Sequence, residues 1–327
     1  MTDYEQLARE DAGLKKRLAQ LKKEVPTRGF ERHPNVLKSI SELPAELRSH
    51  TVTTLASSEN VQTIVAFPPQ IQRGWHYIPK QALLFTPTEV IHLSASVWPG
   101  QDPQIATLKG SGLLYMRVTL ILLYGFMEVV AQGEASPARL GVEFNTVAWT
   151  YLSRPVRQFL QAAGTAAGAL AEGFRVSPAA LPDFEKLPLK FSNGVKIHGL
   201  LPGEELEGLV FQPAVWKRWL VWFRKPVLAN TLVLLTSRYV AVIEEEPGVE
   251  QGWIISHIPR SNISGMQNQP RDEWDEVTVQ LERGGQTAGF KILLQDQAAR
   301  DWRERWLSHG GRWQDLPEIK SEQGRGK

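Results

Sequence analysis

Cysteine is absent from all 327 residues of the chain. That absence excludes disulfide bonds, cysteine nucleophiles, thiolate zinc sites and iron–sulfur clusters. Net charge is also small, because 37 Lys and Arg residues oppose 35 Asp and Glu residues and leave a formal charge of +2. A chain with so little excess charge is not a globally basic nucleic-acid-binding protein, although a local basic patch is compatible with this balance.

Catalytic signatures are missing as well. The sequence has no phosphate-binding Gly-x-x-x-x-Gly-Lys, no dinucleotide-binding Gly-x-Gly-x-x-Gly, no Gly-x-Ser-x-Gly and no His-Glu-x-x-His. Its seven histidines are dispersed, without the spacing of metal ligands, and His92 is expected to be a hydrogen-bonded residue of an apolar strand. We therefore predict a non-enzymatic protein without cofactor or metal. The alternative is an enzyme with a site in an interdomain groove.

The most apolar stretch of the chain is residues 113–131, where only Arg117 and Glu128 are charged. Its charge-free part, Val118–Met127, is half the roughly 20 residues that a membrane-spanning helix needs. Its β-branched and aromatic residues favour two buried strands, with a transmembrane segment as the alternative. Met1–Glu24 is charged and has no apolar core, so we expect a cytoplasmic protein, with attachment to the inner face of the membrane as an option.

Residues 1–27 are predicted to form an amphipathic helix, in which Thr2 and Glu5 have the spacing of a capping box. Apolar residues then recur in steps of three and four, with one interruption at Asp11. Such a seam either docks on its own chain or pairs two copies of the chain. The homodimer would use Leu7, Leu14, Leu18 and Leu21.

Two regions of the chain share one pattern of short strands followed by an amphipathic helix. Leu84-Phe85-Thr86 lies 150 positions before Leu234-Leu235-Thr236, and Phe159-Leu160 lies 147 positions before Trp306-Leu307. A nearly constant offset indicates two copies of one unit. The predicted domains are residues 50–172 and 196–315, with a Pro-rich linker at 173–195 and a flexible tail at 316–327.

The strand pattern of the second copy is clearest at Leu232–Thr236, Tyr239–Ile243 and Ile258–Gly265, and a helix with a core tryptophan follows at Asp296–Ser308. This order resembles the bacterial PH-like domains of the pleckstrin-homology superfold. The resemblance implies a mainly β (α+β) fold with two tandem PH-like barrels, each closed by a C-terminal helix, plus an N-terminal helix. It also implies a binding or adaptor module. We predict that the chain scaffolds a protein partner, with attachment to a membrane or to anionic lipid through residues 216–225 as the alternative.

Of the 11 tryptophans, eight lie after residue 200, and Trp302 and Trp306 are assigned to the closing helix. Three others belong to an aromatic and cationic run whose members are candidate ligand-binding or membrane-binding residues: Trp216, Lys217, Arg218, Trp219, Trp222, Arg224 and Lys225. As a helix, this run would separate an aromatic face from a cationic face and suit an anionic membrane. As a strand, it would turn Trp219, Val221 and Phe223 toward a core. A protein partner is a further candidate ligand, and single-stranded nucleic acid is the least favoured one.

Overall fold

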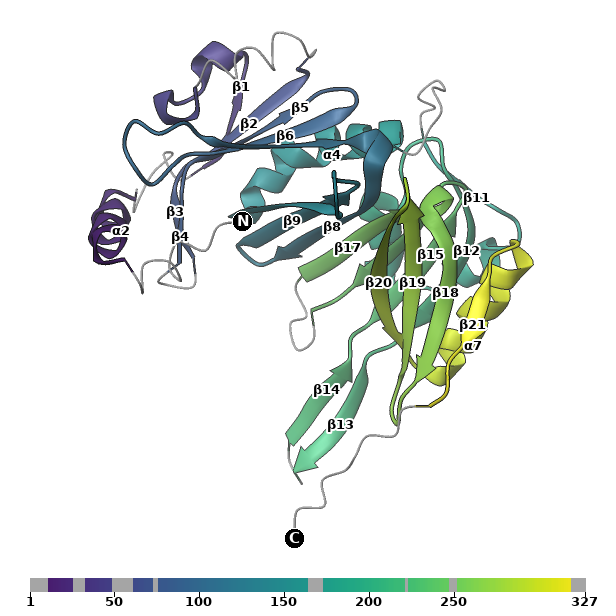
Figure 1. Cartoon of the computed structure of the whole chain (residues 1–327). Helices are drawn as coiled ribbons and strands as arrows, with labels where there is room; N and C mark the ends of the chain where they lie inside the picture. The colour runs from purple at the N-terminus through teal and green to yellow at the C-terminus, as the bar shows by residue number, and fades with distance from the viewer. Residues whose placement is uncertain are drawn as a thin grey trace. The chain divides into compact units, whose positions relative to one another are not determined.

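The computed structural model describes residues 11–25, 33–48, 61–72, 76–163, 173–220, 223–246 and 252–318. It is mainly β, with 46% of it in strands. The chain forms two compact units (Figure 1). Unit 1 comprises residues 1–111, 123–128 and 139–163, and unit 2 comprises residues 112–122, 129–138 and 164–327.

Long runs of strands separated by a few helices make up the chain. The helices are α2 (Ala12–Glu24), α4 (Trp149–Ala163), α5 (Leu181–Glu185), α6 (Leu189–Gly194) and α7 (Asp296–Ser308). The strands of the first half are β1 (Asn35–Leu37), β2 (Thr63–Phe67), β3 (Gln70–Gln72), β4 (His76–Ile78), β5 (Gln81–Phe85), β6 (Glu89–Ser94), β7 (Gln104–Lys109), β8 (Leu113–Ile121), β9 (Tyr124–Ala131) and β10 (Ala138–Asn145). Those of the second half are β11 (Arg175–Val176), β12 (Glu205–Gln212), β13 (Val215–Leu220), β14 (Phe223–Leu228), β15 (Thr231–Thr236), β16 (Tyr239–Glu244), β17 (Gly252–Pro259), β18 (Ile263–Pro270), β19 (Asp275–Arg283), β20 (Gln286–Leu294) and β21 (Trp313–Asp315).

Unit 2 contains an antiparallel meander of β12, β15, β16 and β17, and a four-stranded sheet with the order β20-β19-β18-β21. Strands β15 and β16 are apolar at successive positions because both of their faces are buried. One face contributes Val233, Leu235, Val240 and Val242 to a core that also contains Val277 and Ile292 of the second sheet. Helix α7 completes this core with Trp302 and Trp306, as predicted for the closing helix.

The opposite face of the same meander is covered by the segment that precedes it in the chain. Its residues Leu232, Leu234, Ala241 and Ile243 belong to a second core. Leu187, Phe191 and Val195, from α6 and its flanks, belong to that core as well. The proline-rich composition of 173–195 suggested a linker, and the structure places two short helices there.

The prediction of two closed barrels is wrong, because the described sheets are open. In a closed barrel, the free edge of β17 would join β18. That edge pairs instead with β8, where Ile255 lies opposite Val118, and β18 pairs on its other side with β21. The backbone N–H and C=O groups of an edge strand can pair with any strand that reaches them. Here β8 pairs with the edge of β17 that β18 would occupy in a closed barrel.

Unit 1 is built on a five-stranded antiparallel sheet with the order β1-β2-β5-β6-β7. One face of the sheet contributes Ile64, Leu84, Ile91 and Leu93 to a core. Residues 40–47 cover this face with two single 3₁₀ turns, in which Leu43 and Leu47 are buried against the sheet. As in unit 2, a segment that precedes the meander shields its outer face.

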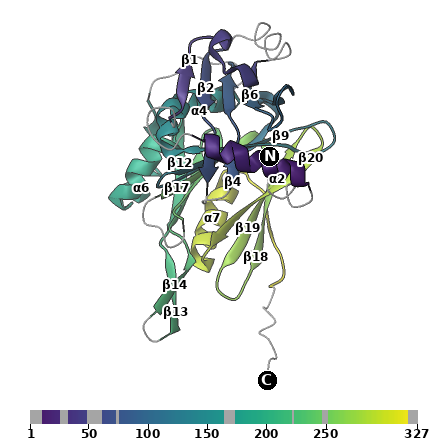
Figure 2. The same cartoon turned by 90° about the vertical axis from the view of Figure 1, so that its left-hand side faces the viewer.

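Helix α2 packs on unit 1 near the short hairpin β3–β4 (Figure 2). Asp11 caps its N-terminus, since its carboxylate accepts hydrogen bonds from the backbone N–H groups of Gly13 and Leu14. Leu14 and Leu18 are buried against Tyr77 and Val97, which is the arrangement expected of a helix that docks on its own chain. The homodimer stays a prediction, and Leu7, Thr2 and Glu5 lie outside the described residues.

The two halves of the chain repeat one order of elements. Hairpin β5–β6 (residues 81–94) lies 150 positions before hairpin β15–β16 (residues 231–244). A two-stranded ribbon precedes each hairpin, β3–β4 in the first half and β13–β14 in the second. A run of four strands and a helix then follow in both halves, β7–β10 with α4 in the first and β17–β20 with α7 in the second. This element-by-element agreement supports the internal duplication that the sequence offsets indicate.

The apolar stretch 113–131 forms β8 and β9, two strands joined by Leu122 and Leu123. This is the strand alternative predicted from its β-branched and aromatic residues. Among the described residues, none of the helices has both the length and the apolar character to cross a membrane.

Candidate functional site

The aromatic and cationic run lies in a two-stranded antiparallel ribbon, β13–β14, which we call the cationic ribbon (residues 215–228). The helical interpretation of this run is therefore wrong. The ribbon is a sheet of its own, and Figures 1 and 2 both show it extending away from the meander of unit 2. Successive residues of a strand face opposite sides, so the ribbon presents its residues in cross-strand pairs instead of on one helical face.

The register of the ribbon places like charges opposite one another. Lys217 pairs with Lys225, and Arg218 pairs with Arg224. These four residues form two adjacent cationic rungs. Like charges directly opposite in a sheet are generally destabilising, so this register departs from the usual cross-strand pairing.

An apolar rung lies next to the cationic ones, toward the end of the ribbon that is remote from the meander. There Leu220 pairs with Phe223, after an irregularity in register that falls at Trp219. Val221 and Trp222 connect this pair in the sequence and lie outside the described residues, so the position of Trp222 is a prediction that stays untested. The strand interpretation, with Trp219, Val221 and Phe223 turned toward a core, likewise concerns side chains outside the described set.

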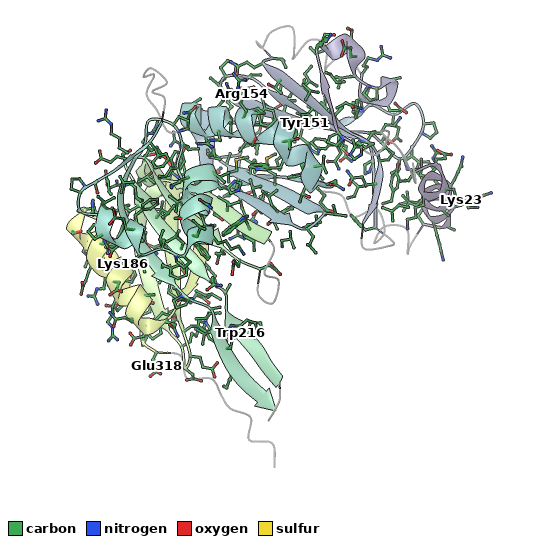
Figure 3. The ribbon with its side chains drawn as sticks, turned by 180° about the vertical axis from the view of Figure 1, so that it is seen from behind. Lys23, Tyr151, Arg154, Lys186, Trp216 and Glu318 are labelled. Carbon is green, nitrogen blue, oxygen red and sulfur yellow. The ribbon has the colours of Figure 1, made fainter. Side chains whose placement is uncertain are left out.

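The base of the ribbon is defined in more detail. Trp216 pairs with Pro226 and is 51% exposed, an unusual state for a side chain of this size (Figure 3). The ammonium group of Lys217 forms an ion pair with the carboxylate of Glu273, which lies between β18 and β19. Glu273 thus partly balances one cation of the site. Sequence reasoning missed it, because nothing in a separation of 56 positions indicates the contact.

The equivalent ribbon of unit 1 has a different character. In β3–β4, Ile71 pairs with Tyr77 and Gln72 pairs with His76, so none of its rungs is a pair of cations. Tyr77 is buried beneath α2. The two ribbons therefore differ: in unit 1 the ribbon supports a helix of the same chain, and in unit 2 its register pairs cationic residues and its Trp216 is exposed.

Within the described residues, His, Asp and Glu side chains do not gather in any group of three that could hold a metal ion. Comparisons of the sequence with protein-family models and with curated proteins give no match.

Proposed function

We propose that this chain is a non-enzymatic binding protein that attaches to anionic membrane surfaces through the cationic ribbon. The observation that carries this proposal is the order of the rungs, with an apolar pair at the remote end and two cationic pairs directly behind it. A strand rises about 3.3 Å per residue, so the cationic rungs lie roughly 7 to 10 Å behind the apolar rung along β13 and roughly 3 to 7 Å behind it along β14. Apolar side chains enter the membrane interface to a depth of about 5 to 10 Å.

The geometry of the ribbon therefore matches the layers of a membrane surface. With Leu220 and Phe223 at the level where headgroups meet acyl chains, the two cationic rungs come to the level of the lipid phosphates. Each cation near an anionic surface contributes about 1 kcal/mol. Because Glu273 partly balances Lys217, the four cations contribute roughly 3 to 4 kcal/mol at low salt. The same phosphates relieve the repulsion between the paired cations of the free ribbon.

Scaffolding of a protein partner is the second candidate function. It is favoured by the exposed Trp216, since tryptophan and arginine are enriched at protein interfaces. A partner with acidic side chains would suit the cationic rungs. For the purified chain this candidate predicts no sedimentation with vesicles, and the membrane proposal predicts sedimentation that increases with the fraction of anionic lipid.

Neutralising one cationic rung tests the membrane proposal. We expect the double variant Arg218→Gln/Arg224→Gln to bind phosphatidylserine-containing vesicles about 30-fold more weakly than the wild type, because two cations contribute about 2 kcal/mol. Sedimentation of the full chain with phosphatidylcholine vesicles of increasing phosphatidylserine content measures this effect. The binding should also weaken as salt is added.

The matched control removes the same charge elsewhere. Lys15 and Lys16 are exposed residues of α2, so Lys15→Gln/Lys16→Gln lowers the net charge equally without touching the ribbon. It should bind vesicles nearly as well as the wild type. An equal loss in both double variants would assign the attraction to overall charge and refute a ribbon-specific site, as would failure of the wild type to sediment with anionic vesicles at low salt.

A further inference from the structure

Unit 1 contains a cavity of about 160 Å³ that nothing in the membrane proposal uses. Strands β4, β5, β6, β7 and β10 line it, and all of its lining residues belong to unit 1. Its polar lining includes Gln81, His92, Ser94, Gln104 and Arg139. An apolar fold does not need such a lining, because polar groups are costly to bury unless they find partners.

Because the two halves of the chain repeat one order of elements, unit 2 shows which residues lie at the positions equivalent to the cavity lining. The rungs of hairpins β5–β6 and β15–β16 correspond at an offset of 150, with Gln81–Ser94 equivalent to Thr231–Glu244 and Leu83–His92 equivalent to Val233–Val242. Val242 is fully buried in the core that Trp302 completes. In unit 2 the position of His92 is thus filled by an apolar side chain, so the polar cavity of unit 1 is a departure from the shared fold.

The deepest polar pair of the cavity is already joined. His92 Nε2 lies 3.3 Å from Gln81 Oε1, and both residues lie on adjacent strands of the sheet. With His92 Nε2–H as donor, the Gln81 carbonyl oxygen is the acceptor, and the amide N–H groups of Gln81 are left to donate to a guest. Burial lowers the pKa of His92 to about 4, so its imidazole is neutral at pH 7.

The remaining lining groups define the chemistry of a guest. The cavity has no Asp or Glu in its lining, and Arg139 lies at the rim, where its side chain is 66% exposed. Its Nη1 donates a hydrogen bond of 3.2 Å to Glu128 Oε1 outside the lining, which leaves the other N–H groups of the guanidinium as donors for a guest. Ser94 is a buried hydroxyl that can donate a hydrogen bond. A guest therefore meets N–H and O–H donors, among them those of a guanidinium that Glu128 engages through one nitrogen, and such donors suit the two oxygens of a carboxylate.

We propose that this cavity is a binding site for a small organic carboxylate, whose oxygens accept hydrogen bonds from Gln81 and Ser94 and whose charge faces Arg139. The size of the cavity limits the guest. A cavity of about 150 Å³ holds a benzene molecule, so the carboxylate has about six to eight non-hydrogen atoms. This site is in unit 1 and is independent of the ribbon in unit 2.

Butyrate and its neutral analogue butyramide are the probes that test the charge preference. Binding to the full chain is measured by ligand-observed NMR, together with the imidazole resonances of His92. We expect saturable binding of butyrate that shifts those resonances, and binding at least ten-fold weaker in Arg139→Gln. Butyramide should bind weakly and equally to the wild type and to Arg139→Gln, because its interaction does not use the charge.

Three further variants keep the test decisive. Arg154 is an exposed residue of α4 that does not line the cavity (Figure 3), so Arg154→Gln should bind butyrate as the wild type does. His92→Val introduces the residue that unit 2 has at the equivalent position and should abolish the binding of butyrate. Gln81→Thr copies Thr231 of unit 2 in the same way and should weaken the binding of butyrate. It replaces His92→Val as the test if that variant does not fold. Absence of butyrate binding to the wild type, or binding unchanged in Arg139→Gln, would overturn the proposal.

Discussion

Replacing Trp302 by alanine is expected to lower the free energy of unfolding of unit 2 by about 4 kcal/mol, the usual range for removing a buried tryptophan being roughly 3 to 5 kcal/mol. Its side chain is 0% exposed and lies in the core shared by the two sheets and α7. The indole Nε1–H points to Met266 Sδ at 3.2 Å, and the ring stacks on Trp306 with centroids 6.4 Å apart. The substitution leaves a large void among side chains from three different elements, which cannot all close in.

Differential scanning calorimetry of the full chain measures this loss. For a unit of this size, about 4 kcal/mol corresponds to a fall of roughly 8 to 16 °C in the unfolding midpoint. The control is Trp216→Ala, which removes the same atoms from the exposed base of the ribbon and should change stability by no more than about 0.5 kcal/mol. Equal shifts in the two variants would contradict the placement of Trp302 at the centre of the core.

The elements of this core could be predicted because their sequences contain the necessary signals. Val277, Val279 and Leu281 alternate with polar residues, as expected for a strand with one buried face, and β19 has that pattern. Helix α7 follows from the spacing of Ala299, Trp302 and Trp306 on one face. The periodicity of apolar residues is a property of a single segment, so it does not depend on which strand or helix the segment packs against.

Sheet closure could not be predicted in the same way. The pairing of β8 with β17 joins residues separated by more than a hundred positions, and β-strands of similar composition compete for such an edge. Nothing in the sequence of β17 distinguishes β8 from β18 as its neighbour. Resemblance to a barrel fold therefore predicted the order of strands and helix, and the particular pairings of this chain left the sheets open.

The candidate site is visible in the sequence as a run of charged and aromatic residues, but its conformation is ambiguous there. Between Trp216 and Pro226, the apolar positions fit a helical face and also fit alternate strand positions. Neither the helical nor the strand periodicity predicts the register between β13 and β14, which places Arg218 opposite Arg224. The cavity of unit 1 had one visible signal, a histidine in an otherwise apolar strand, whose significance depends on the comparison with Val242.

Acidification is expected to destabilise unit 1 through His92 by about 3 kcal/mol. Burial lowers the pKa of this imidazole from 6.5 to about 4 in the folded state. Between these two values the unfolded chain binds a proton that the folded chain does not, so the contribution of His92 to stability is complete above about pH 6.5 and is lost as the pH falls toward 4. A difference of roughly 2.5 pKa units corresponds to about 3 kcal/mol at about 1.4 kcal/mol per unit.

Carboxylates throughout the chain also titrate over this range, so the effect is isolated by comparing variants. His92→Gln removes the titrating group, and the difference in unfolding free energy between wild type and variant should shrink as the pH is lowered from about 7 to about 4.5. Parallel curves for the wild type and His92→Gln would show that His92 is protonated equally easily in both states.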